Sequence, residues 1–272
     1  MHRARGYLHG VIPLARSLEP LVRDAGAIAR RHFRRVEAEF KGDGSPVSAA
    51  DREVEALLVE GLRARFPDDA VLGEESGLHG PVDAPRLWLI DPIDGTAAYL
   101  AGLPTWAVSV GLVVDGAPQV GLVYLPITGE MYTADPVEGA RLDGAALRTP
   151  RGAVGRRASV LWSSRPHQDL KTTWPGRVWG VHSAAVTMVY AARGGVAAGL
   201  LTTVGSYDLA GAIPVLRGAG AALVYLDTGA PVSIAAFLLE GRAPAPILCA
   251  HPDLLPDLQR HFQWVRAGET TR

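Results

Sequence analysis

Residues 88–96 read Trp-Leu-Ile-Asp-Pro-Ile-Asp-Gly-Thr, an apolar run that ends in two carboxylates three positions apart. The apolar residues predict a short buried strand. Pro92 has no N–H and is expected to stop the strand ladder, and the Asp-Gly-Thr sequence contains residue types that begin helices. Asp91 and Asp94 are therefore expected at a strand end, beside the first turn of a helix.

Such a turn can bind both a cation and an anion. Hard cations such as Mg²⁺ bind through a few carboxylates plus a substrate phosphate, and the free N–H groups at a helix start attract anions. The alternative is that Asp91 and Asp94 are ordinary turn residues, as Asp-Pro and Asp-Gly pairs often are. This turn alone does not decide between the two.

Further carboxylates stand before and after this turn. Glu74 and Glu75 follow a short apolar run, Asp51 opens an amphipathic segment, and Asp208 precedes another apolar run. Singly, each has a structural explanation: a first-turn acid that favours the helix dipole for Asp51, a solvated loop for the glutamates, and an N-cap for Asp208. Their occurrence together in one chain favours a functional site.

Taken in order, these segments resemble the inositol monophosphatase superfamily of metal-dependent, lithium-sensitive phosphatases. The resemblance covers most of the chain, and it is strongest over residues 51–121 and 182–220. The matching segments are Gly73-Glu74-Glu75-Ser76, the Asp-Pro-Ile-Asp-Gly-Thr motif at 91–96, His182-Ser183-Ala184-Ala185, Tyr207-Asp208-Leu209-Ala210-Gly211, and the early Asp51.

The resemblance implies a metal centre with Asp91 as the bridging ligand. Glu74, Asp91 and the carbonyl of Ile93 would hold one Mg²⁺, and Asp91, Asp94 and Asp208 would hold a second. Family members often recruit a third, weaker Mg²⁺ near Glu74. Two such cations can clamp the attacking and leaving oxygens of an in-line displacement.

The resemblance also implies catalytic and substrate-binding roles. Glu74 belongs to the catalytic set, and Thr96, hydrogen-bonded to Asp51, would orient the attacking water. The phosphate would lie against the N–H groups of Gly95 and Thr96. His182, Ser183, Ala184 and Leu201 would line the substrate side.

Two of these substrate-side positions depart from the family pattern. Inositol-preferring members have an acidic residue where this chain has Leu201, and an unpaired buried hydroxyl costs about 1–3 kcal/mol, so inositol 1-phosphate is expected to be a poor substrate. His182 replaces a glycine, and the alternative for it is a structural histidine. Four cationic residues are candidates for binding a second anion or, alternatively, members of a charged surface loop: Arg165, His167, Lys171 and Arg177.

The composition suits an enzyme that recognises its partners locally. The chain has 272 residues and a net charge of −1, so no global charge favours nucleic acid or an anionic membrane. The single cysteine, Cys249, excludes a disulfide framework and fits a reducing cytoplasm. No apolar run reaches the length of a membrane span, and the first ten residues lack a signal-peptide core.

The predicted fold is a layered α-β-α-β-α sandwich with mixed α+β and α/β character, as the resemblance implies. Helices are expected at about 14–40 and 48–66, the second with Ser48 and Asp51 as a capping pair. Strands are expected at 106–114 and 120–124 around the hairpin signal Asp115-Gly116. Further expected elements are strands at 130–133, 160–162, 199–201, 223–226 and from 247, and a helix from 183. Near Pro150 the chain would divide into an N-terminal half, 1–150, with most metal ligands, and a C-terminal half, 151–272, with Asp208.

The sequence therefore predicts a Mg²⁺-dependent phosphatase that acts on a small phosphomonoester: a sugar or polyol phosphate, a histidinol-phosphate-like compound or a nucleotide 3′-phosphate. The alternative is a catalytically retired homologue that binds phosphorylated ligands without turnover. Retention of all the predicted metal carboxylates favours the enzyme. A homodimer is implied by the resemblance.

Overall fold

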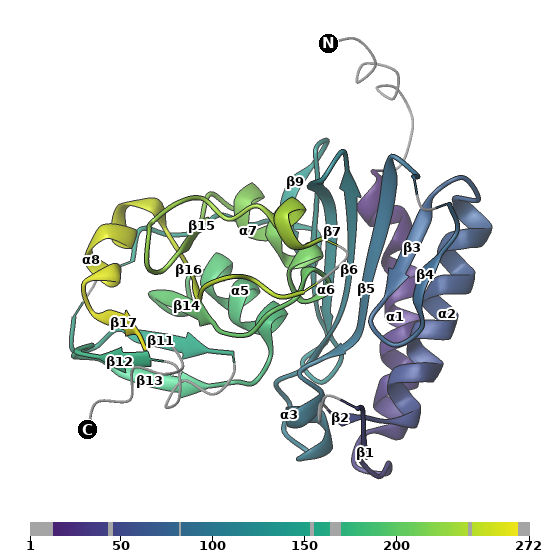
Figure 1. Ribbon diagram of the computed structural model, residues 1–272, viewed down its shortest axis with the longest axis horizontal. Coiled ribbons are helices and arrows are strands. Elements are labelled where there is room, and N and C mark those ends of the chain that lie inside the picture. Colours follow the sequence, from purple (N-terminus) through teal and green to yellow (C-terminus); the bar gives the residue numbers. More distant parts are fainter. Residues whose placement is uncertain are drawn as a thin grey trace.

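The structure, a computed structural model, describes residues 13–42, 46–81, 83–152, 155–163, 170–238 and 241–265. Its helices and strands form layers in the order α-β-α-β-α (Figure 1). This confirms the predicted architecture. No helix in the described ranges is long and apolar enough to cross a membrane.

The outer helices α1 (Leu14–His32) and α2 (Ala49–Arg65) cover one face of the large sheet (Figure 1). The predicted extension of the first helix to Phe40 is wrong. Phe33 leaves the helical region with ψ of 128°, and Arg34 has a φ of 62°. The chain then turns into a small antiparallel pair, β1 (Glu39–Phe40) with β2 (Pro46–Val47).

The second predicted helix is confirmed, together with its cap. The Ser48 hydroxyl oxygen accepts the N–H of Ala50 at 3.2 Å, and Asp51 Oδ2 accepts the N–H of Ser48 at 2.8 Å. This reciprocal arrangement satisfies N–H groups that a helix start leaves free. The cap also fixes Asp51, which is fully buried, at the inner end of α2.

The large sheet has eight strands, antiparallel except for β3 against β5. Asp115 and Gly116, with φ of 49° and 76°, join β6 to β7 as the hairpin signal predicted. Across the sheet the strands are β10 (Ala145–Ala146), β9 (Gly139–Leu142), β8 (Glu130–Asp135), β7 (Ala117–Leu125), β6 (Ala107–Val114), β5 (Arg86–Asp94), β3 (Ala70–Gly73) and β4 (Gly77–His79).

The prediction that Pro92 ends the ladder needs correction, because β5 continues to Asp94 through an irregular register. Asp91 pairs with Ser109 and Asp94 with Ala107, so three steps on β5 match two on β6. A bulge of this kind accommodates a residue that cannot donate and redirects the neighbouring side chains. Both aspartates are consequently buried at the end of the strand.

A layer of helices separates the large sheet from a five-stranded mixed sheet (Figure 1). The helices are α5 (Ala184–Arg193), α6 (Ser206–Ala210) and α7 (Ala212–Gly218). The second sheet contains β13 (Arg177–Gly180), β11 (Ser159–Trp162), β14 (Ala198–Leu201), β16 (Ile247–Ala250) and β15 (Ala222–Tyr225). The remaining elements are α3 (Thr96–Leu100), β12 (Leu170–Thr172), η1 (Ile234–Phe237), η2 (Pro252–Leu254), α8 (Leu255–Gln259) and β17 (Phe262–Trp264).

One apolar cluster extends from the large sheet through the helix layer to the second sheet. It includes Leu89 and Val123 on the first sheet, Val189 on α5, and Leu223 and Cys249 on the second. The two predicted halves therefore share a core in the structure. Their division near Pro150 stays a prediction.

Candidate metal centre

Three carboxylates from two layers converge at the end of β5. Asp91 and Asp94 lie on the bulged end of that strand, and Asp208 comes from α6 in the helix layer. One oxygen of each lies within 4.8 Å of the others. An all-oxygen set of this size suits a hard divalent cation. Asp91 Oδ1 is buried and has no hydrogen-bond partner. This oxygen is therefore available to bind a cation.

The cluster carries unfavourable electrostatics when no cation is bound. Burial, followed by repulsion from Glu74 and Asp94, raises the pKa of Asp91 well above its ordinary value. Burial and the same two carboxylates raise the pKa of Asp208 to about 8. Burial raises the pKa of Asp94 to about 6 even though hydrogen bonds oppose the shift. The site therefore fits a cation that would relieve this repulsion.

These shifts predict that stability of the metal-free protein falls as the pH rises. An unfolded aspartate titrates near pKa 3.9, whereas Asp94 and Asp208 titrate in the folded chain at about 6 and about 8. The folded state thus binds more protons in this window, and the free energy of unfolding decreases as they dissociate. Urea unfolding in EDTA between about pH 5 and pH 8.5 should show this fall.

A divalent cation held by these carboxylates should flatten that pH profile, because it would stabilise their ionised forms. Saturating Mg²⁺ should consequently raise the unfolding free energy more at the alkaline end than at the acidic end. A metal-free protein whose stability rises across the same window would contradict the assigned shifts.

Asp94 is held by the start of α5. Its carboxylate accepts the N–H of Ala184 at 3.1 Å and of Ala185 at 2.6 Å, together with the hydroxyl of Ser183. Ser183 also caps α5 by accepting the N–H of Val186 at 3.0 Å. Ser183 and Ala184 were predicted to contact substrate. The structure places these groups on Asp94 and leaves both residues almost fully buried. Their contact with substrate stays a prediction.

Gly95 permits this contact between β5 and α5. Its φ of 95° favours glycine, and a Cβ there would lie 3.0 Å from the carbonyl oxygen of His182 and 3.0 Å from Ser183 Cβ. A larger residue would push the two segments apart. The Asp-Gly pair of the motif is therefore a requirement of close packing as well as a helix start.

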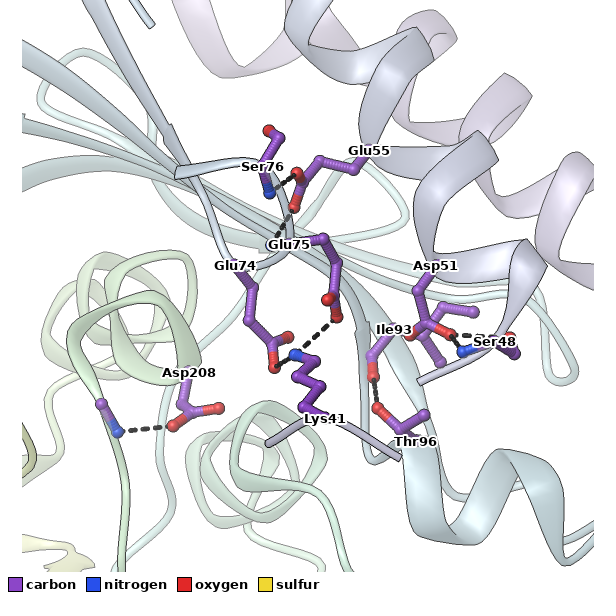
Figure 2. A network of polar contacts seen from close by, with 11 residues as sticks. Lys41, Ser48, Asp51, Glu55, Glu74, Glu75, Ser76, Ile93, Thr96 and Asp208 are labelled. Atoms are coloured by element: carbon purple, nitrogen blue, oxygen red, sulfur yellow. Dashed lines mark hydrogen bonds and ion pairs between the residues drawn. The ribbon is translucent and has the colours of Figure 1, made fainter. Parts of the chain in front are cut away.

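The predicted hydrogen bond between Thr96 and Asp51 is absent. The Thr96 hydroxyl donates to the Ile93 carbonyl at 3.1 Å, and Asp51 Oδ2 accepts from Ser48 instead (Figure 2). Asp51 Oδ1 is buried and has no partner. Burial raises the pKa of Asp51 to about 6. Asp51 therefore keeps one free acceptor, while the only hydroxyl proton of Thr96 is engaged.

Glu74, the fourth predicted metal carboxylate, is paired with Lys41. Lys41 Nζ lies 2.8 Å from Glu74 Oε1 and 2.8 Å from Glu75 Oε1, between the two side chains (Figure 2). Burial raises the pKa of Glu74 although Lys41 opposes the shift. Burial alone would lower the pKa of Lys41, but the two glutamates outweigh it and raise the value.

Lys41 is a site residue that sequence reasoning missed. It is one of only two lysines in the chain and lies in the segment before Asp51. The small number of lysines was the one sequence feature that distinguished Lys41. Its partners could not be predicted from nearby residues, because the glutamates follow more than thirty positions later. The ammonium is a cation already present among the carboxylates.

The two departures from the family pattern have different outcomes. Leu201 is fully buried in the apolar cluster that joins the sheets and has no surface at the site, so the prediction that it contacts substrate is not supported. His182 is exposed and has a φ of 57°, a conformation uncommon outside glycine. Its contact with substrate stays a prediction.

The four cationic candidates do not gather into an established second anion site. Lys171 lies on β12 and the exposed Arg177 on β13. Arg165 and His167 lie outside the described residues. A role for any of them in anion binding stays a prediction.

Comparisons with known proteins show the family of the chain. The model of the Inositol monophosphatase family matches residues 13–260. The inositol-1-monophosphatase of Synechocystis sp. is 31% identical over 241 residues, which is 84% of this chain and 82% of that protein. The histidinol-phosphatase of Chlorobaculum parvum is 36% identical over 149 residues, but the match spans only 54% of this chain and 57% of that protein.

Solved structures show the same fold. The IMPase of Thermotoga maritima has a TM-score of 0.77 at 23% identity, with 89% of this chain and 93% of that chain covered. The extragenic suppressor protein suhB of Bartonella henselae has a TM-score of 0.79 at 23% identity, with 90% and 96% covered.

Proposed function

This chain belongs to the inositol monophosphatase family, and from that premise we propose that it is a Mg²⁺-dependent phosphatase of small phosphomonoesters. The observation that carries the proposal is the convergence of Asp91, Asp94 and Asp208, whose oxygens lie within 4.8 Å of one another. Keeping two buried carboxylates and a partly buried one together destabilises the metal-free chain. Cation binding is the function that offsets this cost.

The predicted ligand set divides the work among the chain's own residues. Asp91, Asp94 and Asp208 hold the cation, and Glu74 and the Ile93 carbonyl complete the set for two or three Mg²⁺. When bound, the cations neutralise charge on the phosphoryl oxygens and make water more acidic. Lys41 contacts one oxygen of Glu74, Oε1, so Glu74 would hold a cation through its other oxygen or by releasing Lys41.

Asp51 is the group we assign to the attacking water. Its Oδ1 is buried, unpaired and free to accept a hydrogen bond. Its pKa of about 6 leaves it mostly ionised at neutral pH. The N–H groups of Gly95 and Thr96, at the start of α3, would hold the phosphate. Positioning and charge neutralisation of this kind are what phosphoryl transfer requires.

The substrate is a sugar or polyol phosphate, a histidinol-phosphate-like compound or a nucleotide 3′-phosphate. Relatives carry the names histidinol-phosphatase and inositol-1-monophosphatase, so both classes belong in a test. Leu201 offers no carboxylate for a ring hydroxyl, and its side chain is fully buried. The lack of an acidic group at this position, and not a contact made by Leu201, favours substrates other than inositol phosphates.

A phosphate-release screen tests the function and the preference together. We expect Mg²⁺-dependent release from at least one compound in these classes. We also expect a kcat/KM for inositol 1-phosphate at least about tenfold below that for the best compound. Inositol 1-phosphate as the best substrate would refute the preference and leave the metal site standing, whereas no release from any compound would refute the phosphatase.

The proposal also includes a cellular location and an oligomeric state. We place it in the cytoplasm, as a homodimer that acts on a small phosphorylated metabolite. The buried thiol of Cys249 is compatible with a reducing compartment. Sedimentation of the purified chain would determine the oligomeric state.

A further inference from the structure

Glu55 is a buried carboxylate outside the predicted ligand set. It lies one helical turn after Asp51 on α2 and is 2% exposed. Within the described residues it forms no ion pair. Its oxygens instead accept two successive main-chain N–H groups, Oε2 from Glu75 at 2.9 Å and Oε1 from Ser76 at 2.7 Å. Burying a carboxylate is costly unless it is hydrogen-bonded, and here main-chain N–H groups supply the hydrogen bonds. The contact therefore fixes the position of this main-chain segment.

The segment that Glu55 holds carries Glu74. Glu74 directly precedes the two residues that Glu55 holds. Its N–H donates at 3.2 Å to the carbonyl of Ile90, which lies next to Asp91 on β5. The loop is therefore tied to β5 at Glu74 and to α2 immediately afterwards. These two anchors fix where the Glu74 side chain leaves the main chain.

The packing around Gly73 shows that this approach is built into the chain. A Cβ on Gly73 would lie 2.4 Å from Glu55 Cδ. Any residue other than glycine would therefore clash with the carboxylate and displace it. Figure 2 shows Glu55 reaching the loop from one side, while Glu74 points from the other side towards Lys41 and Asp208. Glu55 thus contacts the loop's main chain and leaves the metal side of the loop open.

We propose that Glu55 is a positioning residue for the metal centre: by clamping the N–H groups of Glu75 and Ser76, it holds Glu74 where it can share a cation with Asp91. The proposal rests on the proposed metal-dependent function. Hydrogen-bond partners of the groups that carry metal ligands commonly alter metal affinity about 10–100-fold when they are replaced. The effect of Glu55 should accordingly appear in cation affinity.

Titration calorimetry of the metal-free, full-length chain with Mg²⁺ alone tests this. Glu55→Gln keeps one acceptor oxygen but turns an NH₂ group towards the second N–H, and we expect its Kd for Mg²⁺ to rise about tenfold. Glu60→Gln is the matched control: it removes the same charge from an exposed position on the same helix and should leave the Kd unchanged. In kinetic assays, excess Mg²⁺ should restore the kcat of Glu55→Gln with little change in substrate KM.

Glu55→Asp separates positioning from simple charge. It keeps the negative charge but is one methylene too short to hold both N–H groups, so positioning predicts weakened Mg²⁺ binding for it as well. Wild-type affinity in Glu55→Asp with weak binding in Glu55→Gln would show a charge effect and overturn the proposal, as would wild-type affinity in both. If Glu55→Gln fails to fold, Glu55→Asp decides.

Calorimetry also distinguishes this proposal from the proposed function. A wild-type chain that binds Mg²⁺ but releases phosphate from no substrate would refute the phosphatase and leave the comparison of Glu55 variants valid. A wild-type chain that binds no Mg²⁺ would overturn both.

Discussion

Asp91→Asn is expected to lower kcat/KM for phosphate release about a thousandfold or more, which corresponds to about 4 kcal/mol of lost transition-state stabilisation. Asp91 is the predicted bridging ligand, and its Oδ1 is buried without any other partner. An amide in its place leaves the cations with too little negative charge around them. Steady-state phosphate release over a range of Mg²⁺ concentrations measures the loss.

The fold should survive this substitution. Asn has nearly the shape of Asp, and its neutral side chain removes repulsion that raises the pKa of Asp91, so stability in EDTA should be unchanged or higher. Asp68→Asn, at an exposed position, is the control and should keep full activity. Near-normal Mg²⁺-dependent turnover by Asp91→Asn would sink the bridging assignment.

Asp94→Ala should cost both activity and stability, because Asp94 serves the metal cluster and the start of α5. Its removal leaves the Ser183 hydroxyl and the N–H groups of Ala184 and Ala185 without their acceptor. An unsatisfied buried donor costs about 1–3 kcal/mol. Relief of charge repulsion offsets part of this, so we expect the free energy of unfolding in EDTA to fall by about 2–4 kcal/mol.

Asp208→Asn provides the comparison for that loss. The carboxylate of Asp208 accepts the N–H of Gly205 at 2.5 Å and, among the described residues, the N–H of no other residue. An amide oxygen can still accept this hydrogen bond. Asp208→Asn should lose activity while keeping its stability in EDTA. Equal stability of Asp94→Ala and the wild type would show that Asp94 does not hold the two layers together.

Local chemistry predicted the elements whose signals lie within a few residues. Ser48 and Asp51 form the cap expected from their spacing, and the Asp115-Gly116 turn has the positive φ values that its residue types favour. The bulge at Pro92 was only half predicted. The missing N–H was evident from the sequence, but resumption of the strand at Asp94 depends on pairing with β6.

The features that the sequence did not predict depend on contacts between segments far apart in the chain. Nothing near Lys41 indicates that its ammonium lies between Glu74 and Glu75. Likewise, position alone placed Leu201 at the substrate, whereas packing between the two sheets buries it completely. The end of α1 at His32 is set by the turn into β1 and its pairing with β2.

In the site, too, the sequence predicted the motif carboxylates but not the distant groups that hold them in place. Motif residues predicted that Asp91, Asp94 and Asp208 would meet, and the structure brings their oxygens together. The groups that hold those carboxylates were assigned other tasks or none. Ser183 was expected on substrate and binds Asp94, and Glu55 had no assignment although it holds the Glu74 loop.

Metal-dependent catalysis is tested most directly by phosphate release from EDTA-treated, wild-type protein as Mg²⁺ is added back, measured on the best compound of the screen. We expect no turnover above background without metal and saturable recovery as Mg²⁺ rises. Turnover that persists undiminished in EDTA would contradict the claim that the carboxylates of Asp91, Asp94 and Asp208 act by holding a cation.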